Sequence, residues 1–111
     1  MAIITLRESI TQAMREELAR DENVFIMGCD VGLRGNPFGI TKGLMAEFGE
    51  RRVIDTPISE AAFTGLGVGA AIVGMRPLVE ILYADFLTLA MDNIVNTAAK
   101  TSYMFGGQAN V

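Results

Sequence analysis

Residues 55–74 read DTPISEAAFTGLGVGAAIVG and contain one isolated candidate for acid–base chemistry, Glu60. Across residues 56–79, the only other side chain charged at neutral pH is Arg76. Two interpretations of the Glu60 carboxyl group are open. In the first turn of a helix it is stabilised by the helix dipole. In apolar surroundings it can hold or exchange a proton near neutral pH, as catalytic carboxyl groups do.

The composition excludes several other kinds of chemistry. The chain has 111 residues, no histidine and one cysteine, Cys29. Histidine-based zinc and iron sites, Ser-His-Asp triads and internal disulfides therefore cannot be built from this chain. The formal charge is -4, and the scattered Lys and Arg residues form no basic stripe for nucleic acid. Any acid–base work must fall to carboxyl groups, and we expect no metal site in this chain.

Two glycine-rich segments invite other functions. The glycines of GLGVGAAIVG resemble a dinucleotide fingerprint, but they begin several residues into a predicted helix instead of directly after a strand. We therefore favour close backbone packing, and a nucleotide-binding α/β protein stays an alternative. The loop over residues 30–43, DVGLRGNPFGITKG, lacks the ending of a phosphate-binding P-loop. It is either a plain surface loop or a functional one, since long loops often carry function.

The elements that must position Glu60 follow from hydrophobic periodicity. Thr5 and Glu8 form a capping-box pattern, which predicts a helix that ends near Arg20. Its predicted inward face consists of Leu6, Ile10, Ala13, Met14 and Leu18.

Short apolar runs at residues 24–27, 53–54 and 78–82 alternate with helical segments at 41–48 and 59–74. A last helix is expected to begin at an Asp85 cap, with an inward face of Leu87, Ala90, Met91, Ile94, Val95 and Ala98. This pattern predicts an α/β fold: one domain over residues 1–111, with a parallel sheet of at least three strands and helices on both faces.

Ligands of such sheets bind beyond the carboxyl ends of the strands. The candidate surface is therefore formed by residues 28–39, 55–60 and 82–86, and it includes Glu60. The N-terminus has no secretory pattern, and the most apolar stretch, residues 61–75, is shorter than the ~20 residues of a membrane span. We expect a cytoplasmic protein with no membrane partner.

Three segments, DTPISEAAFTGLGVGAAIVGMRP, DFLTLAMDNIVNTAAK and YMFGG, carry a family resemblance. They resemble the beta subunit of the thiamine-diphosphate-dependent decarboxylating component of 2-oxo acid dehydrogenase complexes. Pyruvate, branched-chain oxo acid and acetoin dehydrogenases are similar here. The resemblance extends over residues 5–111, and TPISE is its most specific part. It implies a transketolase-like pyrimidine-binding domain of an oxidoreductase.

The resemblance also implies roles for named residues. The glutamate of TPISE, here Glu60, would contact the aminopyrimidine ring of thiamine diphosphate. A protonated Glu60 would donate a hydrogen bond to the ring nitrogen opposite the exocyclic amine and favour the tautomer that removes the thiazolium proton. Ile58, Leu82 and Phe86 would line the pyrimidine, with Phe86 stacked on its face.

Three departures from the family bear on partners. Cys29 stands where relatives often carry an acidic residue. The family's diphosphate and magnesium are held by a partner alpha subunit through a GDG motif, and no such motif occurs here. The chain stops at GGQANV, where the family continues, so we expect an incomplete domain that needs an alpha subunit and self-associates through apolar helices. The alternative is a non-catalytic, truncated interaction or oligomerisation module of the same fold. The specific 2-oxo acid is left open, because both chains would line its site.

Overall fold

The fold is described from a computed structural model, which describes residues 3–111. In chain order its elements are α1 (Leu6–Arg20), β1 (Val24–Gly28), α2 (Leu44–Phe48), β2 (Val53–Asp55), α3 (Glu60–Ile72), β3 (Arg76–Val79), the 3₁₀ turn η1 (Ala84–Phe86), α4 (Leu87–Met91), the π-helical segment η2 (Asp92–Ala98) and α5 (Ala99–Met104). Strands and helices alternate as the sequence predicts.

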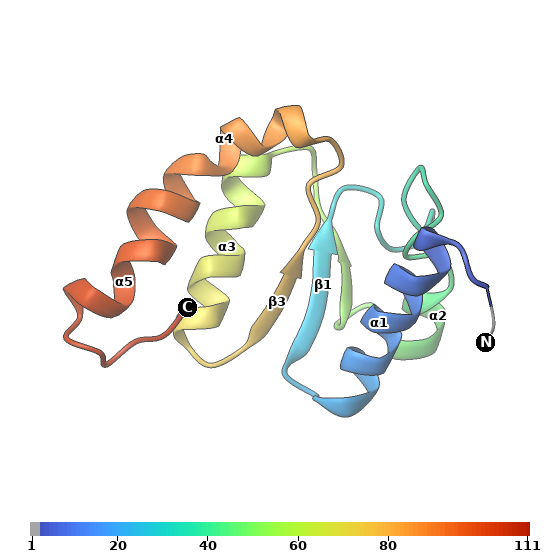
Figure 1. The fold of residues 1–111 in the computed structure, drawn as a ribbon, viewed down its shortest axis with the longest axis horizontal. Coiled ribbons are helices and arrows are strands. Elements are labelled where there is room, and N and C mark those ends of the chain that lie inside the picture. The colour runs from blue at the N-terminus through green and yellow to red at the C-terminus, as the bar shows by residue number, and fades with distance from the viewer. Residues whose placement is uncertain (1–2) are drawn as a thin grey trace.

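The three strands form one parallel sheet with β1 at its centre, in the order β2-β1-β3. All five residues of β1 are buried, which explains why its sequence is a continuous apolar run and not an alternating one. Alternate β1 side chains point to opposite faces. Val24 and Ile26 pack with α1 and α2, whereas Phe25 and Met27 pack with Phe63 of α3. Figure 1 shows these helices on opposite sides of the sheet, so the predicted fold class is confirmed.

The third strand differs from its prediction in position. It covers residues 76–79 instead of 78–82, because pairing begins where the Arg76 backbone N–H donates to the carbonyl of Asn23. The last bond to β1 is donated by the Glu80 N–H to the carbonyl of Met27. Leu82 therefore lies beyond the strand, in the segment that leads to η1.

Helix α1 begins as predicted but buries less of its apolar face. The Thr5 hydroxyl accepts from the Glu8 N–H at 3.2 Å, and the Glu8 carboxylate accepts from the Thr5 N–H at 2.7 Å, so the capping box is confirmed. Leu18 is buried and Met14 is half-buried against the core. The remaining members of the predicted inward face are exposed, because the sheet beneath α1 covers only its C-terminal half: Leu6, Ile10 and Ala13.

The predicted cap of the last helix, Asp85, is wrong. The helical stretch begins two residues earlier than predicted, with η1, so Tyr83 takes the capping position and Asp85 lies inside the first turn. The Thr88 hydroxyl donates to the Asp85 carbonyl at 2.9 Å. Of the predicted inward face, Ala90 is buried and Ile94 and Ala98 are half-buried. The other members of the predicted face are exposed: Leu87 and Met91 in α4, and Val95 in η2.

The glycines of α3 serve packing, and they differ in how tightly they are enclosed. A Cβ added to Gly67 would lie 2.5 Å from Val79 Cγ2, whereas one added to Gly69 would meet no atom within 4 Å. Close approach of α3 to β3 therefore requires Gly67. No helix in the described part of the chain is both long and apolar enough to span a membrane.

This difference predicts opposite results for two identical substitutions. Both gain about 1 kcal/mol of helix propensity over glycine. Gly69→Ala should therefore raise the free energy of unfolding by about 0.5–1 kcal/mol. Gly67→Ala should lower it by up to about 2 kcal/mol, because overpacking against Val79 costs about 1–3 kcal/mol. Urea unfolding of the two variants measures the difference, and equal effects at both positions would contradict the packing role of Gly67.

Candidate functional site

The three parallel strands end at one edge of the sheet, and the segments that follow them form the candidate site. Strand β1 ends at Gly28, β2 at Asp55 and β3 at Val79. In Figure 1 this is the upper edge, where α3 begins and where η1 leads into α4. The Asn93 side chain fixes the helices to each other here, since its Nδ2 donates to the Ala61 carbonyl at 2.7 Å.

Glu60 is the first residue of α3 and is 8% exposed. None of the ion pairs found in residues 3–111 involves it. The N-cap residue, Ser59, makes no side-chain capping bond, and its hydroxyl donates to the Pro57 carbonyl at 3.1 Å. Glu60 thus combines the favourable start of a helix with burial, and both interpretations of its carboxyl group are compatible with this position.

Several acidic groups surround Cys29 at the same edge. Burial raises the pKa of the Cys29 thiol, and the neighbouring carboxyl groups raise it further, in the order Asp30, Glu60, Asp55 and Glu80. A thiol with a raised pKa stays protonated at neutral pH and is a poor nucleophile. The chemistry available at this edge therefore belongs to its carboxyl groups and not to Cys29.

The other predicted site residues occupy the same edge but differ in exposure. Ile58, in the turn before α3, is 80% exposed, and Phe86, at the end of η1, is 42% exposed. Leu82 is half-buried. The Phe86 ring makes an edge-on contact with the ring of Tyr83, with centroids 5.7 Å apart. The structure thus places these side chains at the edge of the sheet where the strands have their carboxyl ends. Of the three, Ile58 is the most exposed to solvent.

Sequence reasoning missed a second acid at this edge, the half-buried Glu80, and its partner Asn36. The Asn36 Nδ2 donates to Glu80 Oε1, and Asn36 is 4% exposed. The other carboxylate oxygen, Glu80 Oε2, is buried with no hydrogen-bond partner among the residues described. The signal was in the sequence, because Glu80 interrupts the apolar run LVEIL as Glu60 interrupts its own segment.

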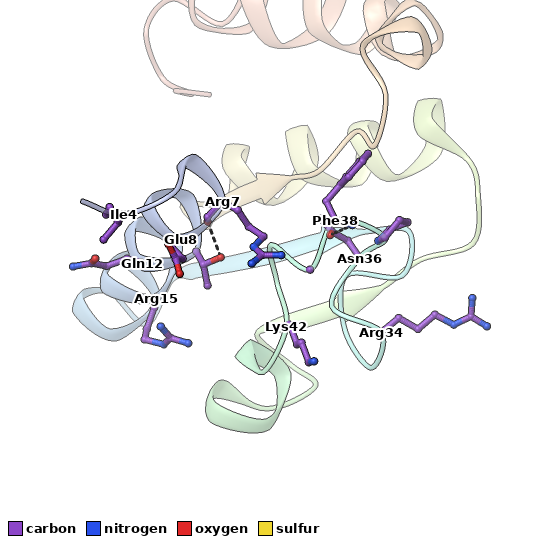
Figure 2. Close-up of a pocket in the computed structure, with 12 residues that line it drawn as sticks. Ile4, Arg7, Glu8, Gln12, Arg15, Arg34, Asn36, Phe38 and Lys42 are labelled. Carbon is purple, nitrogen blue, oxygen red and sulfur yellow. Dashed lines mark hydrogen bonds between the residues drawn. The ribbon is translucent and has the colours of Figure 1, made fainter. Parts of the chain in front are cut away.

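Two hollows lie on the α1 side of the sheet. One, of about 530 Å³, is mostly apolar and is lined by Glu80 and Leu82 together with Ile10, Met14 and Phe38. The other, of about 840 Å³, lies between α1 and the loop over residues 34–42 (Figure 2). Glu60, Ile58 and Phe86 line neither hollow. Neither hollow therefore provides the cleft that the proposed cofactor would need beside Glu60.

The larger hollow is basic. Four cationic side chains and one acidic side chain line it: Arg7, Arg15, Arg34, Lys42 and Glu8. Figure 2 shows Arg7 reaching from α1 toward the loop that carries Asn36 and Phe38, while Arg34 points away. Two of the cations are paired with acids, Arg15 with Glu47 at 2.8 Å and Arg34 with Asp30 at 3.5 Å. Much of the positive charge is thus compensated within the chain.

The burial of Glu80 predicts a pH-dependent contribution to stability. Burial raises the pKa of Glu80 above its usual range, and the Asn36 hydrogen bond opposes this shift. The folded chain therefore holds the Glu80 proton more tightly than the unfolded chain does. The stabilising contribution is complete below the unfolded pKa, about 4.3, and is lost as the pH rises through the raised folded pKa.

Glu80→Gln should remove this loss, because glutamine does not titrate. The stability of the variant relative to wild type is expected to rise between about pH 5 and pH 7. Glu8 and Asp21, whose pKa values are lowered by hydrogen bonds from Thr5 and Asn23, respectively, affect both proteins equally. Urea unfolding at both pH values, with the exposed Glu22→Gln as control, provides the test. A relative stability that is flat or falls with pH would contradict the assignment.

Comparisons with known proteins agree with this architecture. Residues 2–111 match the family model described as "Transketolase, pyrimidine binding domain". The chain belongs to the transketolase pyrimidine-binding domain family. The family predicted from the DTPISE segment is thereby confirmed, and the three-stranded parallel sheet fits such a domain.

Individual members of this family are similar along nearly the whole chain. The pyruvate dehydrogenase E1 component subunit beta of Rickettsia bellii is 53% identical over 105 residues, which is 95% of this chain and 32% of that protein. The corresponding subunit of Rhizobium meliloti is 51% identical over 97% of this chain and 24% of its own length. The mitochondrial subunit of Saccharomyces cerevisiae is 51% identical over 94% of this chain and 28% of its own. This chain spans about a third or less of these relatives.

Proposed function

We propose that this chain supplies the pyrimidine side of a thiamine diphosphate site in a 2-oxo acid dehydrogenase. The observation that carries the proposal is the burial of Glu60 at the start of α3, at the carboxyl edge of a parallel sheet. Relatives named as pyruvate dehydrogenase subunits support the reaction class, oxidative decarboxylation of a 2-oxo acid.

The residues present fit an aminopyrimidine. Glu60 offers a carboxyl group for a ring nitrogen, and Thr56 Oγ1, four residues before it, is buried with no hydrogen-bond partner among residues 3–111. Leu82 and Phe86 offer apolar surface at the same edge. A site with one acid and apolar neighbours suits a flat heterocycle whose polar atoms lie on its rim.

Each residue has a distinct role in this proposal. Glu60 holds a proton at its carboxyl group and hydrogen-bonds the ring, which orients it and tunes its basicity. Ile58, Leu82 and Phe86 contact the faces of the ring and exclude water, which strengthens the Glu60 hydrogen bond. When bound, thiamine diphosphate itself supplies the electron sink for decarboxylation.

In this proposal a second protein chain completes the site. Ile58 and Phe86 are too exposed to enclose a ring by themselves. We propose that an alpha subunit covers them and holds the diphosphate and magnesium. We also propose a cytoplasmic location, although some relatives are named as mitochondrial.

An interaction module without catalysis is the second candidate. The observation that favours it is the apolar surface exposed on α4, η2 and α5, where side chains are 40% exposed or more: Leu87, Leu89, Met91, Val95, Tyr103 and Met104. Exposed apolar surface of this kind marks sites of protein association. We propose self-association through these helices, and it is compatible with either function.

Cofactor binding separates the two candidates. Thiamine diphosphate with Mg²⁺ is titrated calorimetrically into this chain, into an alpha subunit of a pyruvate dehydrogenase E1 component, and into their mixture. The cofactor-site proposal predicts saturable binding in the mixture that neither protein shows alone. Binding by the alpha subunit alone at the same affinity, or no binding in the mixture, would favour the interaction module.

A further inference from the structure

The Asn36 side chain organises the middle of the loop over residues 30–43. Its Oδ1 accepts from the backbone N–H of Phe38 at 2.8 Å and of Ile40 at 3.1 Å. Its backbone N–H donates to the Asp30 carbonyl at 2.7 Å, and its φ is +57°, a left-handed value that asparagine tolerates better than most residues. Asn36 therefore fixes the backbone at Phe38, and with it the position from which the Phe38 side chain extends.

This loop is joined to residues 80–86 at two points. The first is the hydrogen bond from Asn36 Nδ2 to Glu80 Oε1. The second is an edge-on contact between the rings of Phe38 and Tyr83, whose centroids lie 5.9 Å apart at 78°. Tyr83 in turn meets the Phe86 ring edge-on at 89°. Three aromatic rings thus form a continuous row that begins in the loop and ends at η1.

Each ring in this row is about half exposed, so its own element does little to fix its orientation. Edge-on contacts set the relative angle of such rings, because the positive edge of one ring faces the negative face of the next. The Asn36–Glu80 bond fixes the two segments that carry the row. A binding surface holds its geometry only when residues behind it are locked in this way.

We propose that Asn36 and Glu80 are positioning residues that orient Phe86 through Phe38 and Tyr83. The claim rests on the proposed function, which sets Phe86 against the aminopyrimidine. Neither Asn36 nor Glu80 needs to touch the cofactor. Loss of their bond frees the segment around Phe38 from Glu80, changes the orientation of the three rings and weakens cofactor binding, while the chemistry at Glu60 continues.

The chain offers a direct reporter for the row. It has two tyrosines and no tryptophan. Tyr103 is exposed, so a Tyr103→Phe parent leaves Tyr83 as the single tyrosine. Its near-ultraviolet circular dichroism then reports how firmly the Tyr83 ring is held, and this readout needs neither cofactor nor partner.

Two substitutions reverse the direction of the bond. In Asn36→Asp the introduced carboxylate still accepts from the loop N–H groups, but it cannot donate to Glu80 and repels it. Adding Glu80→Gln restores a bond, because the new amide donates toward the carboxylate. We expect Asn36→Asp to lose most of the tyrosine signal and the double variant to regain it. Asn23→Asp, at the opposite edge of the sheet, should match the parent.

The role in cofactor positioning has its own readout. In a mixture with the alpha subunit, Asn36→Asp should raise the KM for thiamine diphosphate about tenfold with kcat within about twofold, equivalent to about 1.4 kcal/mol of binding. The double variant should recover most of the affinity.

Three results would overturn the claim. An unchanged tyrosine signal in Asn36→Asp would show that the row does not depend on this bond, and so would failure of the double variant to recover the signal. A lost signal with unchanged KM would show that Asn36 holds the loop without serving the cofactor. A parent mixture that binds no cofactor would overturn the proposed function instead, and the tyrosine measurements would still report on the bond.

Discussion

Glu60→Gln is expected to lower the rate of 2-oxo acid decarboxylation about 10²- to 10⁴-fold in a mixture with an alpha subunit, thiamine diphosphate and Mg²⁺. Glutamine keeps the shape of the side chain and can still hydrogen-bond the ring, but it cannot exchange the proton. Binding of the cofactor should therefore change much less than turnover. Steady-state rates and calorimetric affinity, measured on the same preparations, separate these two effects.

Glu22→Gln is the matched control for this substitution. Glu22 is exposed and lies before β1, at the opposite edge of the sheet from Glu60. It should leave the rate unchanged. A rate for Glu60→Gln within twofold of wild type would remove Glu60 from the chemistry and leave the helix-dipole interpretation.

The second large effect concerns stability. Arg52→Ala should lower the free energy of unfolding by about 2–4 kcal/mol. The Arg52 guanidinium donates to three backbone carbonyls that end α1 and begin β1: Leu18 at 2.9 Å, Asp21 at 2.8 Å and Val24 at 2.5 Å. Bonds from a charged donor are stronger than neutral ones, and the substitution removes all three at once. The Asp21 carbonyl would keep only its bond from the Val24 N–H, at 3.2 Å.

The neighbouring residue, Arg51, supplies the control. It is exposed, so Arg51→Ala should change stability by no more than about 0.5 kcal/mol. Arg52→Lys should fall between the two, because an ammonium group lacks the planar fork that serves several carbonyls at once. Chemical unfolding of the three variants checks the order. Equal stabilities for Arg51→Ala and Arg52→Ala would contradict the role of Arg52.

Local sequence patterns predicted the elements well where neighbouring residues alone decide the structure. The capping box of Thr5 and Glu8 needs only four residues, and the apolar run of β1 needs only a sheet with two covered faces. The Asp85 cap was wrong because the choice between a 3₁₀ and an α start depends on how the chain leaves the sheet after Glu80. The exposure of Ile10 likewise depends on what lies opposite it in space.

The candidate site was predictable only where neighbouring residues in the sequence mark it. Glu60 stands out as a lone charge beside a helix start, and the fold places it, buried, at the carboxyl edge of the sheet. The roles of Glu60, Ile58, Leu82 and Phe86 toward a cofactor stay predictions. The pairing of Asn36 with Glu80 joins residues 44 positions apart and could not be read from local spacing.

The most direct test of the account is a crystal structure of this chain with an alpha subunit and thiamine diphosphate. We predict a Glu60 carboxyl oxygen at hydrogen-bond distance, about 2.6–3.2 Å, from a nitrogen of the aminopyrimidine ring. Phe86 should lie against a face of that ring. A cofactor bound elsewhere, or a Glu60 side chain covered by other residues with no room for the ring, would contradict the proposed site.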